Sequence, residues 1–154
     1  MKYIIPIILI GVLLFYIFLP ASKDIDDSSK ISILLNNLIK SGERKDLNIV
    51  MEYFSPDYKD ASGRTYPVIK NIIKNAFDRF DVLEGGYSDL IVSIRENGNG
   101  ENEITANLNI WIKGIRKSTP YELIGTEDNP QNINIVLESF MLGGWKILDV
   151  EGLD

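Results

Sequence analysis

The chain has 154 residues, with 22 acidic and 16 basic side chains, a formal charge of −6, no cysteine and no histidine. The lack of cysteine excludes disulfides, thiolate nucleophiles and cysteine-ligated metal sites. The lack of histidine excludes serine–histidine–aspartate triads and histidine-based metal sites. An acidic chain offers no excess of positive charge to phosphate backbones, so we expect no nucleic-acid partner. We also expect no metal and no cofactor.

The first 21 residues form an apolar segment that is separate from the rest of the chain. Residues 3–19 carry no charge, and a helix of that length spans about 26 Å, slightly less than the ~30 Å hydrocarbon core of a bilayer. We interpret residues 1–21 as a transmembrane anchor. The alternative is a cleaved secretory signal, although the apolar run exceeds the usual ~7–15 residues and a cut after Ala21 would place Leu19 at the −3 position.

Charges on either side of this segment predict its orientation. Lys2 precedes the span, whereas Asp24, Asp26 and Asp27 follow it, which favours a cytoplasmic N-terminus. We therefore expect a single pass through the cytoplasmic (inner) membrane with the remainder of the chain outside the cytoplasm, or a secreted, periplasmic protein if the signal is cleaved. Residues 22–27 are predicted to be a polar linker, and residues 28–154 a single domain.

Apolar residues at helical spacing predict three helices in this domain. The first begins near Ser28 and ends at Gly42, the second begins near Asp46 and ends before Pro56, and the third begins at Thr65, which is expected to cap it. Their apolar stripes are Ile31, Leu34, Leu35, Leu38 and Ile39; Leu47, Val50, Met51 and Phe54; and Ile69, Ile72, Ile73, Ala76, Phe77 and Phe80.

After Gly85 and Gly86 the apolar period changes from that of a helix to that of a strand. A short hairpin is expected at 57–66, and the segment 117–130, with two prolines, is expected to be a loop. The predicted strands are 90–95, 104–113, 133–142 and 145–151, the first two joined by a hairpin at 96–102. The predicted fold class is α+β, with three helices packed on one face of a curved antiparallel sheet of about four long strands.

Four short stretches in the expected order carry a family resemblance. They are Lys40-Ser41-Gly42 at the end of the first helix, Met-Glu-Tyr-Phe-Ser-Pro-Asp-Tyr at 51–58, Asp-Ala-Ser-Gly at 60–63, and Gly-Gly-Trp-Lys-Ile-Leu-Asp-Val at 143–150. Over residues 28–151 the chain resembles the nuclear transport factor 2-like superfamily, which includes ketosteroid isomerase-like and polyketide cyclase-like proteins. The resemblance implies a cone-shaped, cystatin-like fold. Because the superfamily holds both enzymes and non-catalytic binding modules, it does not imply one function.

The resemblance also implies candidate residues for acid–base chemistry. Asp60 matches the place of the carboxylate base in the isomerase-like members. Leu35 stands where those members have a tyrosine that donates to the substrate oxyanion, and Glu138, the nearest counterpart of a protonated acid, falls on the polar face of its strand. A base without an oxyanion donor lacks the largest usual catalytic contribution, so we predict no catalytic residue.

Asp60, Tyr58 and Tyr66 are the candidate ligand-pocket residues. We expect Asp60 to face the cone, with a pKa raised by partial desolvation; the alternative is a turn-stabilising role. Arg64 is expected to form an exposed pair with it, worth about 0–1 kcal/mol. Tyr58 and Tyr66 are expected either to form pocket walls or to pack as ordinary half-buried side chains.

Trp111 and Phe140 are the candidate interface residues. Strand alternation places Trp111 on a polar face with Asn107 and Asn109, and places Phe140 on the non-core face beside Glu138. Exposed aromatic residues of this kind are enriched at interfaces, so the outer sheet face is a candidate surface for a homodimer or a protein partner. A bulge that shifts the alternation would return both side chains to the core.

Three functions remain open from the sequence. The first is a non-catalytic, extracytoplasmic domain that binds a ligand or a protein and is tethered by residues 1–21. The second is a structural interaction module, similar in layout to membrane-anchored assembly proteins of type IV secretion. The third is an isomerase- or dehydratase-like enzyme that uses Asp60. An open cavity favours a small-molecule ligand, of unknown identity, or catalysis; a filled cone favours the interaction module.

Overall fold

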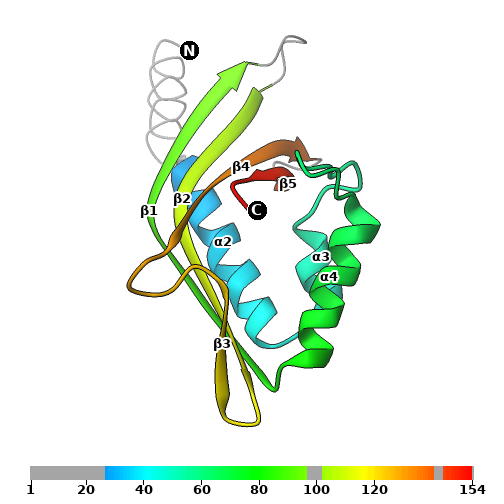
Figure 1. Ribbon diagram of the computed structural model, residues 1–154. Coiled ribbons are helices and arrows are strands. Elements are labelled where there is room, and N and C mark those ends of the chain that lie inside the picture. Colours follow the sequence, from blue (N-terminus) through cyan, green and yellow to red (C-terminus); the bar gives the residue numbers. More distant parts are fainter. Residues whose placement is uncertain (1–26, 97–101, 141–143, 154) are drawn as a thin grey trace, which may run out of the picture.

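The computed structural model describes residues 27–96, 102–140 and 144–153 (Figure 1). The predicted anchor at 1–21, all but the last residue of the predicted linker at 22–27 and most of the hairpin loop at 96–102 lie outside these residues. Among the helices described, none is long and apolar enough to cross a membrane. The elements are helices α2 (Asp27–Glu43), α3 (Leu47–Glu52) and α4 (Tyr66–Arg79), and strands β1 (Val82–Glu96), β2 (Asn102–Arg116), β3 (Thr119–Ile124), β4 (Gln131–Phe140) and β5 (Gly144–Glu151).

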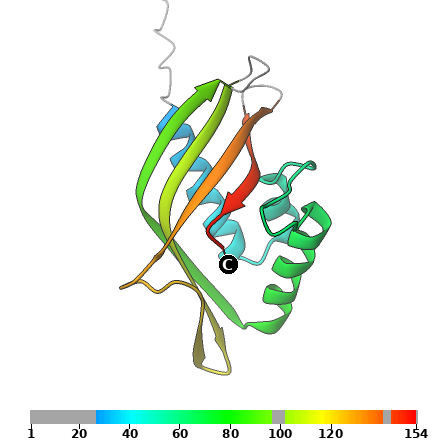
Figure 2. The same cartoon turned by 45° about the horizontal axis from the view of Figure 1, so that its top comes forward.

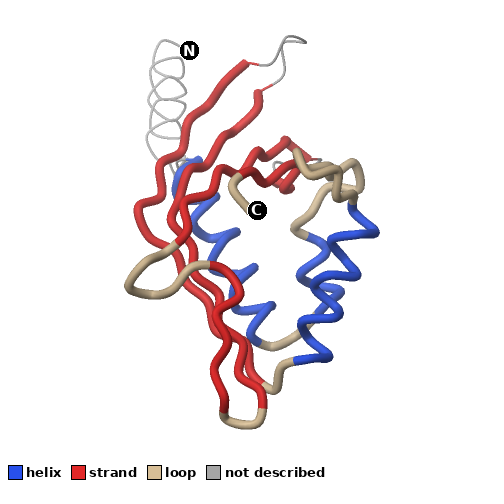
Figure 3. The backbone as a smooth tube through the Cα atoms, in the orientation of Figure 1, coloured by secondary structure: helices blue, strands red, loops and turns tan. Residues whose placement is uncertain are grey.

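The sheet is antiparallel, with the strand order β1-β2-β4-β5, and β3 pairs with β2 at one end. The helices lie on one face of this curved sheet, α2 along its long strands and α3 and α4 farther away, as the views in Figures 2 and 3 show. The predicted α+β class, the helices on one face and the antiparallel pairing are therefore confirmed.

Strand β3 lies inside the segment that was predicted to be a loop, so that prediction is wrong. Arg116 pairs with Thr119 across a two-residue turn in which Lys117 and Ser118 have φ values of 49° and 63°. Such a turn joins two strands directly, but it usually contains asparagine or glycine, and this sequence lacks that signal. Pro120 is tolerated because β3 pairs with β2 alone, and an edge position does not need its N–H.

The start of β1 also differs from the expectation. The strand begins at Val82, so Gly85 and Gly86 lie within it rather than before it. A Cβ atom at Gly86 would come within 2.8 Å of the Trp111 Nε1 atom. The indole ring of Trp111 therefore occupies the space where a side chain at position 86 would stand, and glycine is required there because of this close approach.

The core lies between α2, α3 and the inner face of the sheet. Its most buried side chains include Ile31, Leu35, Val50, Met51, Ile104, Ala106, Leu108, Ile133, Leu137 and Ile147. Helix α4 contributes no buried residue, although its apolar spacing is the most regular of the three. Thr65 stands at its N-cap, as predicted, but makes no side-chain capping hydrogen bond, whereas Asp46 caps α3 by accepting from the Ile49 N–H at 3.2 Å.

Main-chain hydrogen bonds attach the segment after α3 to the free edge of β5. The Ile147 N–H donates to the Tyr53 carbonyl at 2.8 Å, the Ser55 N–H donates to the Ile147 carbonyl at 2.8 Å, and the Lys59 N–H donates to the Leu148 carbonyl at 3.1 Å. The hairpin predicted at 57–66 is reduced to one bridge, between Lys59 and Thr65. The attachment covers a sheet edge that would otherwise expose unpaired backbone groups.

Gly114 provides a test of how the end of α4 packs on the sheet. A Cβ atom there would lie 2.6 Å from the ring of Phe80, which is 4% exposed. We expect Gly114→Ala to lower the free energy of unfolding by about 1–3 kcal/mol through overpacking, measured by urea denaturation. Gly144→Ala is the control, because a Cβ atom there meets nothing within 4 Å. Equal losses in the two variants would contradict this packing.

Candidate functional site

A cavity of about 670 Å³ lies between α4 and the inner face of the sheet. Its walls are mainly aliphatic and aromatic; they include Leu38 and Ile39 from α2, Ile69, Ile72, Ile73 and Phe77 from α4, and Ile110, Ile112, Ile133 and Ile135 from β2 and β4. Two of the lining residues, Ile72 and Leu123, are 45% and 39% exposed. The apolar surface of the cavity therefore continues to its mouth, where solvent reaches it.

The cavity lies where α4 covers the rest of the domain only in part. None of the α4 residues is fully buried, although Ile69, Ile73 and Phe77 pack against the edge of the core. Helix α4 contacts α3, and its apolar stripe, which the sequence predicted as part of the core, also lines the cavity. A continuous, partly exposed apolar surface of this kind is costly in water and typically marks a site that binds something. Volume and lining both fall in the range of small-molecule sites.

Four charged side chains lie among the lining residues: Arg64, Arg79, Glu43 and Glu84. Their formal charges cancel, and Glu84 is further paired with the Lys113 ammonium at 2.6 Å. No group of acidic side chains in the described residues could hold a metal ion. The charge balance of the walls suits an uncharged ligand better than an ion.

Asp60 lies beside the cavity and is almost fully buried, at 4% exposed. Its carboxylate accepts hydrogen bonds from the Arg64 N–H at 2.9 Å, the Arg64 Nε atom at 2.5 Å and the Tyr58 hydroxyl at 3.2 Å. Tyr58 and Arg64 line the cavity, and Asp60 lies behind them rather than on its surface. The expectations that Asp60 faces the cone and that its pair with Arg64 is exposed are therefore wrong.

The pKa of Asp60 moves in the direction opposite to the one expected. Burial by itself would raise this pKa, but the hydrogen bonds from Arg64 and Tyr58, together with the Arg64 charge, hold it below its usual range. Burial and the neighbouring Asp60 charge raise the pKa of Tyr58, so its hydroxyl stays protonated and donates. A carboxylate stabilised in its ionised form by three donors is a weak base.

Asp149 on β5 is a second acid in this region, and no sequence motif pointed to it. Its Oδ1 atom is buried and has no hydrogen-bond partner among the described residues. Burial raises the pKa of Asp149, and the charges of Glu151 and Asp60 add to that shift, while the Val150 N–H opposes it. Ile147 and Val150 are both buried although they are three residues apart, because the register of β5 shifts between them. Strand alternation therefore could not predict which way Asp149 points.

The pocket candidate Tyr66 and the two remaining isomerase-like positions, Leu35 and Glu138, do not gather around the cavity. Tyr66 is half-buried and its hydroxyl lies 3.5 Å from the Met51 carbonyl, which fits the packing alternative. Leu35 is a core residue, 4% exposed. Glu138 accepts a hydrogen bond from the Ser55 hydroxyl, which itself accepts from the Asp57 N–H. None of these three side chains lines the cavity.

The two interface candidates lie on β2 and β4. Trp111 is half-buried and covers Gly86, while its neighbours Ile110 and Ile112 point into the cavity on the other face, as alternation predicted. Phe140 is the last residue of β4, and its side chain lies outside the described part. A partner on the outer face of the sheet stays a prediction.

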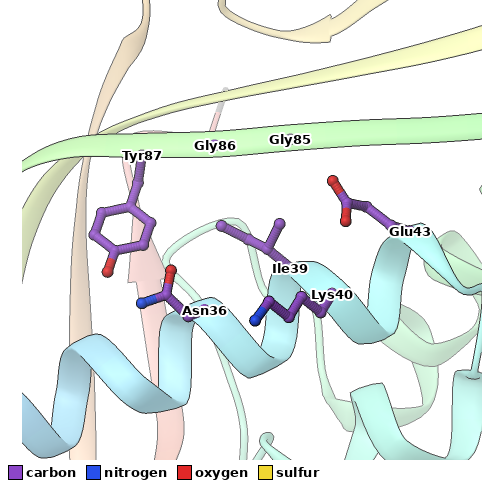
Figure 4. A pocket seen from close by; sticks show the side chains of 7 residues that line it. All are labelled: Asn36, Ile39, Lys40, Glu43, Gly85, Gly86 and Tyr87. Carbon is purple, nitrogen blue, oxygen red and sulfur yellow. The ribbon is translucent and has the colours of Figure 1, made fainter.

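A second hollow, of about 470 Å³, lies between α2 and β1 (Figure 4). Side chains of α2 face Gly85, Gly86 and Tyr87 across it. The Tyr87 and Ser32 hydroxyls, 2.9 Å apart, join the two elements. Because two of its lining residues are glycines without side chains, this hollow offers less apolar wall than the cavity beneath α4, which remains the candidate site.

No protein-family model and no curated protein matches the sequence, but solved structures share the fold. A Novosphingobium aromaticivorans protein, provisionally described as a scytalone dehydratase, aligns with a TM-score of 0.63 and 10% identity over 79% of this chain and 78% of its own. ActVI-ORFA from Streptomyces coelicolor aligns with a TM-score of 0.59 and 11% identity over 79% of this chain and 92% of its own.

Bd1075 from Bdellovibrio bacteriovorus aligns with a TM-score of 0.60 and 10% identity over 79% of this chain, and the match spans only 39% of Bd1075. At these identities the comparisons show the fold alone. They support the cystatin-like α+β fold that the resemblance implied.

The paired Asp60 predicts a pH-dependent stability. We expect Asp60→Asn to lower the free energy of unfolding at neutral pH by about 1.5–3 kcal/mol, the usual contribution of a hydrogen bond to a charged group. The pKa of Asp60 is lower in the folded state than its unfolded value of ~3.9. Its contribution is therefore present above that value and is lost as the pH falls through the folded pKa.

The difference in stability between wild type and Asp60→Asn should accordingly shrink below about pH 4, as measured by urea denaturation across a pH series. Asp78→Asn is the matched control, because Asp78 forms an exposed pair with Lys74 at 2.6 Å and such pairs contribute about 0–1 kcal/mol. A neutral-pH loss no larger than in the control would show that the Asp60 network does not stabilise the fold.

Proposed function

We propose that this domain binds a small, uncharged and mostly apolar molecule in the cavity beneath α4, without converting it chemically. The observation that carries the proposal is the unfilled apolar cavity of about 670 Å³. A protein interior is normally close-packed, and here the apolar stripe of α4 is only partly buried and lines the cavity. A bound molecule would cover the apolar surface that the protein leaves exposed.

The residues around the cavity favour binding over catalysis. Asp60, the one match to the isomerase-like base, is set behind the cavity wall and bonded to three donors. Leu35, at the oxyanion-donor position, is a core residue with no group to donate. Proton abstraction needs a base within reach of the substrate and a donor for the developing charge.

Filling the cavity is the direct test. We expect Ile73→Trp, at a lining position of α4, to weaken the binding of the uncharged fluorescent probe N-phenyl-1-naphthylamine at least about tenfold, a loss of ~1.4 kcal/mol, because the larger ring takes the space of the probe. Titration of the purified protein with the probe measures the affinity.

Ile49→Trp is the control, because Ile49 is 39% exposed on α3 and does not line the cavity. It adds the same ring to the protein and should leave probe affinity within about twofold, a difference of only ~0.4 kcal/mol. Equal affinities in the two variants would refute binding in this cavity, and thermal unfolding of both confirms that each is folded.

We further propose that residues 1–21 tether the domain outside the cytoplasm, on the basis of the uncharged run at 3–19. The acidic domain is not attracted to anionic lipid headgroups, so the anchor alone would hold it at the membrane.

The full chain, expressed in a bacterium, should stay in the membrane fraction through carbonate extraction and keep its N-terminal peptide by mass spectrometry. A chain that lacks residues 1–21 should be extracted, and a product that begins near Ser22 would establish a cleaved signal instead.

A further inference from the structure

The segment that follows β5 forms part of the cavity wall. We call residues 152–153 the strap. The Leu153 side chain lines the cavity, and both strap carbonyls are held by side chains: Gln131 Nε2 donates to the Gly152 carbonyl, and Arg64 Nη2 donates to the Leu153 carbonyl at 2.9 Å. The strap is therefore fixed from β4 on one side and from the α3–α4 connection on the other.

The backbone of Gly152 explains how closely the strap approaches β4. Its φ of +88° lies in the left-handed region that glycine adopts without strain, and a Cβ atom there would lie 2.8 Å from the Asn132 carbonyl oxygen. The turn directs Leu153 back toward the apolar walls, where it is partly buried against the core. A side chain so placed decides how far the cavity extends in that direction.

Arg64 joins this strap to the buried Asp60. Its guanidinium uses two nitrogens at once, Nε for the Asp60 carboxylate at 2.5 Å and Nη2 for the Leu153 carbonyl. Asp60 is itself fixed by the Tyr58 hydroxyl and the Arg64 N–H. Because the guanidinium fork is rigid, the position of Asp60 sets the position of the strap, and a lysine could not reproduce both bonds.

We propose that Leu153 sets the length of ligand that the cavity accepts, and that Asp60 and Arg64 are positioning residues that hold the strap in place. This inference rests on the proposed function, binding of an uncharged apolar molecule in the same cavity. It also explains why the ion pair is buried at this place in the fold. The carboxylate at the position of a family base fixes a wall of the cavity instead of removing a proton.

Chain-length preference tests the role of Leu153. Straight-chain alcohols from butanol to dodecanol are used to displace N-phenyl-1-naphthylamine from the purified protein, and the wild type should prefer one length. Leu153→Ala should move the optimum toward longer alcohols by up to about three carbons, the number that the substitution removes, and Leu153→Trp should move it toward shorter ones. A general loss of protein stability would not move the preferred alcohol length in opposite directions in these two variants.

Arg64→Lys tests the positioning role. It keeps the charge but loses the two-nitrogen bridge, so we expect the probe to dissociate at least about fivefold faster, a difference of ~1 kcal/mol, and the chain-length optimum to broaden. Arg44→Lys is the matched control: the Arg44 Nε atom also donates to a carbonyl, that of Lys40 at 3.2 Å, but this arginine does not line the cavity.

The outcomes separate the two proposals. If wild type binds neither the probe nor any alcohol, the proposed function fails and the strap inference fails with it. If wild type binds but both Leu153 variants keep its preferred length, or Arg64→Lys behaves like Arg44→Lys, the strap inference alone is overturned. If the tryptophan variant does not fold, Leu153→Ala and Arg64→Lys still decide the question.

Discussion

The backbone hydrogen bonds that attach residues 53–59 to the free edge of β5 position both α4 and the cavity. This irregular segment hydrogen-bonds to β5 in the place where another strand would pair, so it covers the edge of the sheet. It also determines where α4 begins, because Thr65 is bridged to Lys59 within the attached segment. Helix α4 starts beyond this sheet edge and runs back toward β1 above the inner face of the sheet. The cavity is the space between α4 and that face.

A gap of this size must be stabilised at its borders, and the contacts at its two ends are of different kinds. At the end near β1, Phe80 packs against the bare backbone of Gly114 and lies 5.7 Å, between ring centroids, from Tyr121 of β3. At the end near β5, the contacts are polar: Tyr58, Asp60 and Arg64 bond to one another and to the strap. One end is closed by apolar packing, and the other by directional hydrogen bonds, which specify position more sharply.

The sequence was sufficient for the elements whose signal is local. The stripes around Leu35 and Met51, and the alternation that buries Ile104 and Leu108, predicted α2, α3 and β2 because each pattern is set by burial on one face. It was insufficient where the outcome depends on distant partners. The stripe of α4 predicts a helix correctly, but whether Ile73 meets the sheet or open space depends on the route of the chain before the helix. The turn at 117–118 lacks the usual residues, so β3 was missed.

Asp60 shows that a residue can occupy the position of a family's catalytic base without having the surroundings that a base needs. The acid stands where the resemblance places a base, yet its surroundings decide its protonation and its access. With Arg64 four residues later and Tyr58 two residues earlier, three donors converge on it, and ionisation is favoured despite burial. Hydrogen-bond donors that fix the position of a carboxylate also stabilise its ionised form, and this makes it a poor proton acceptor. The same bonds therefore weaken Asp60 as a base and hold its side chain in place beside the cavity.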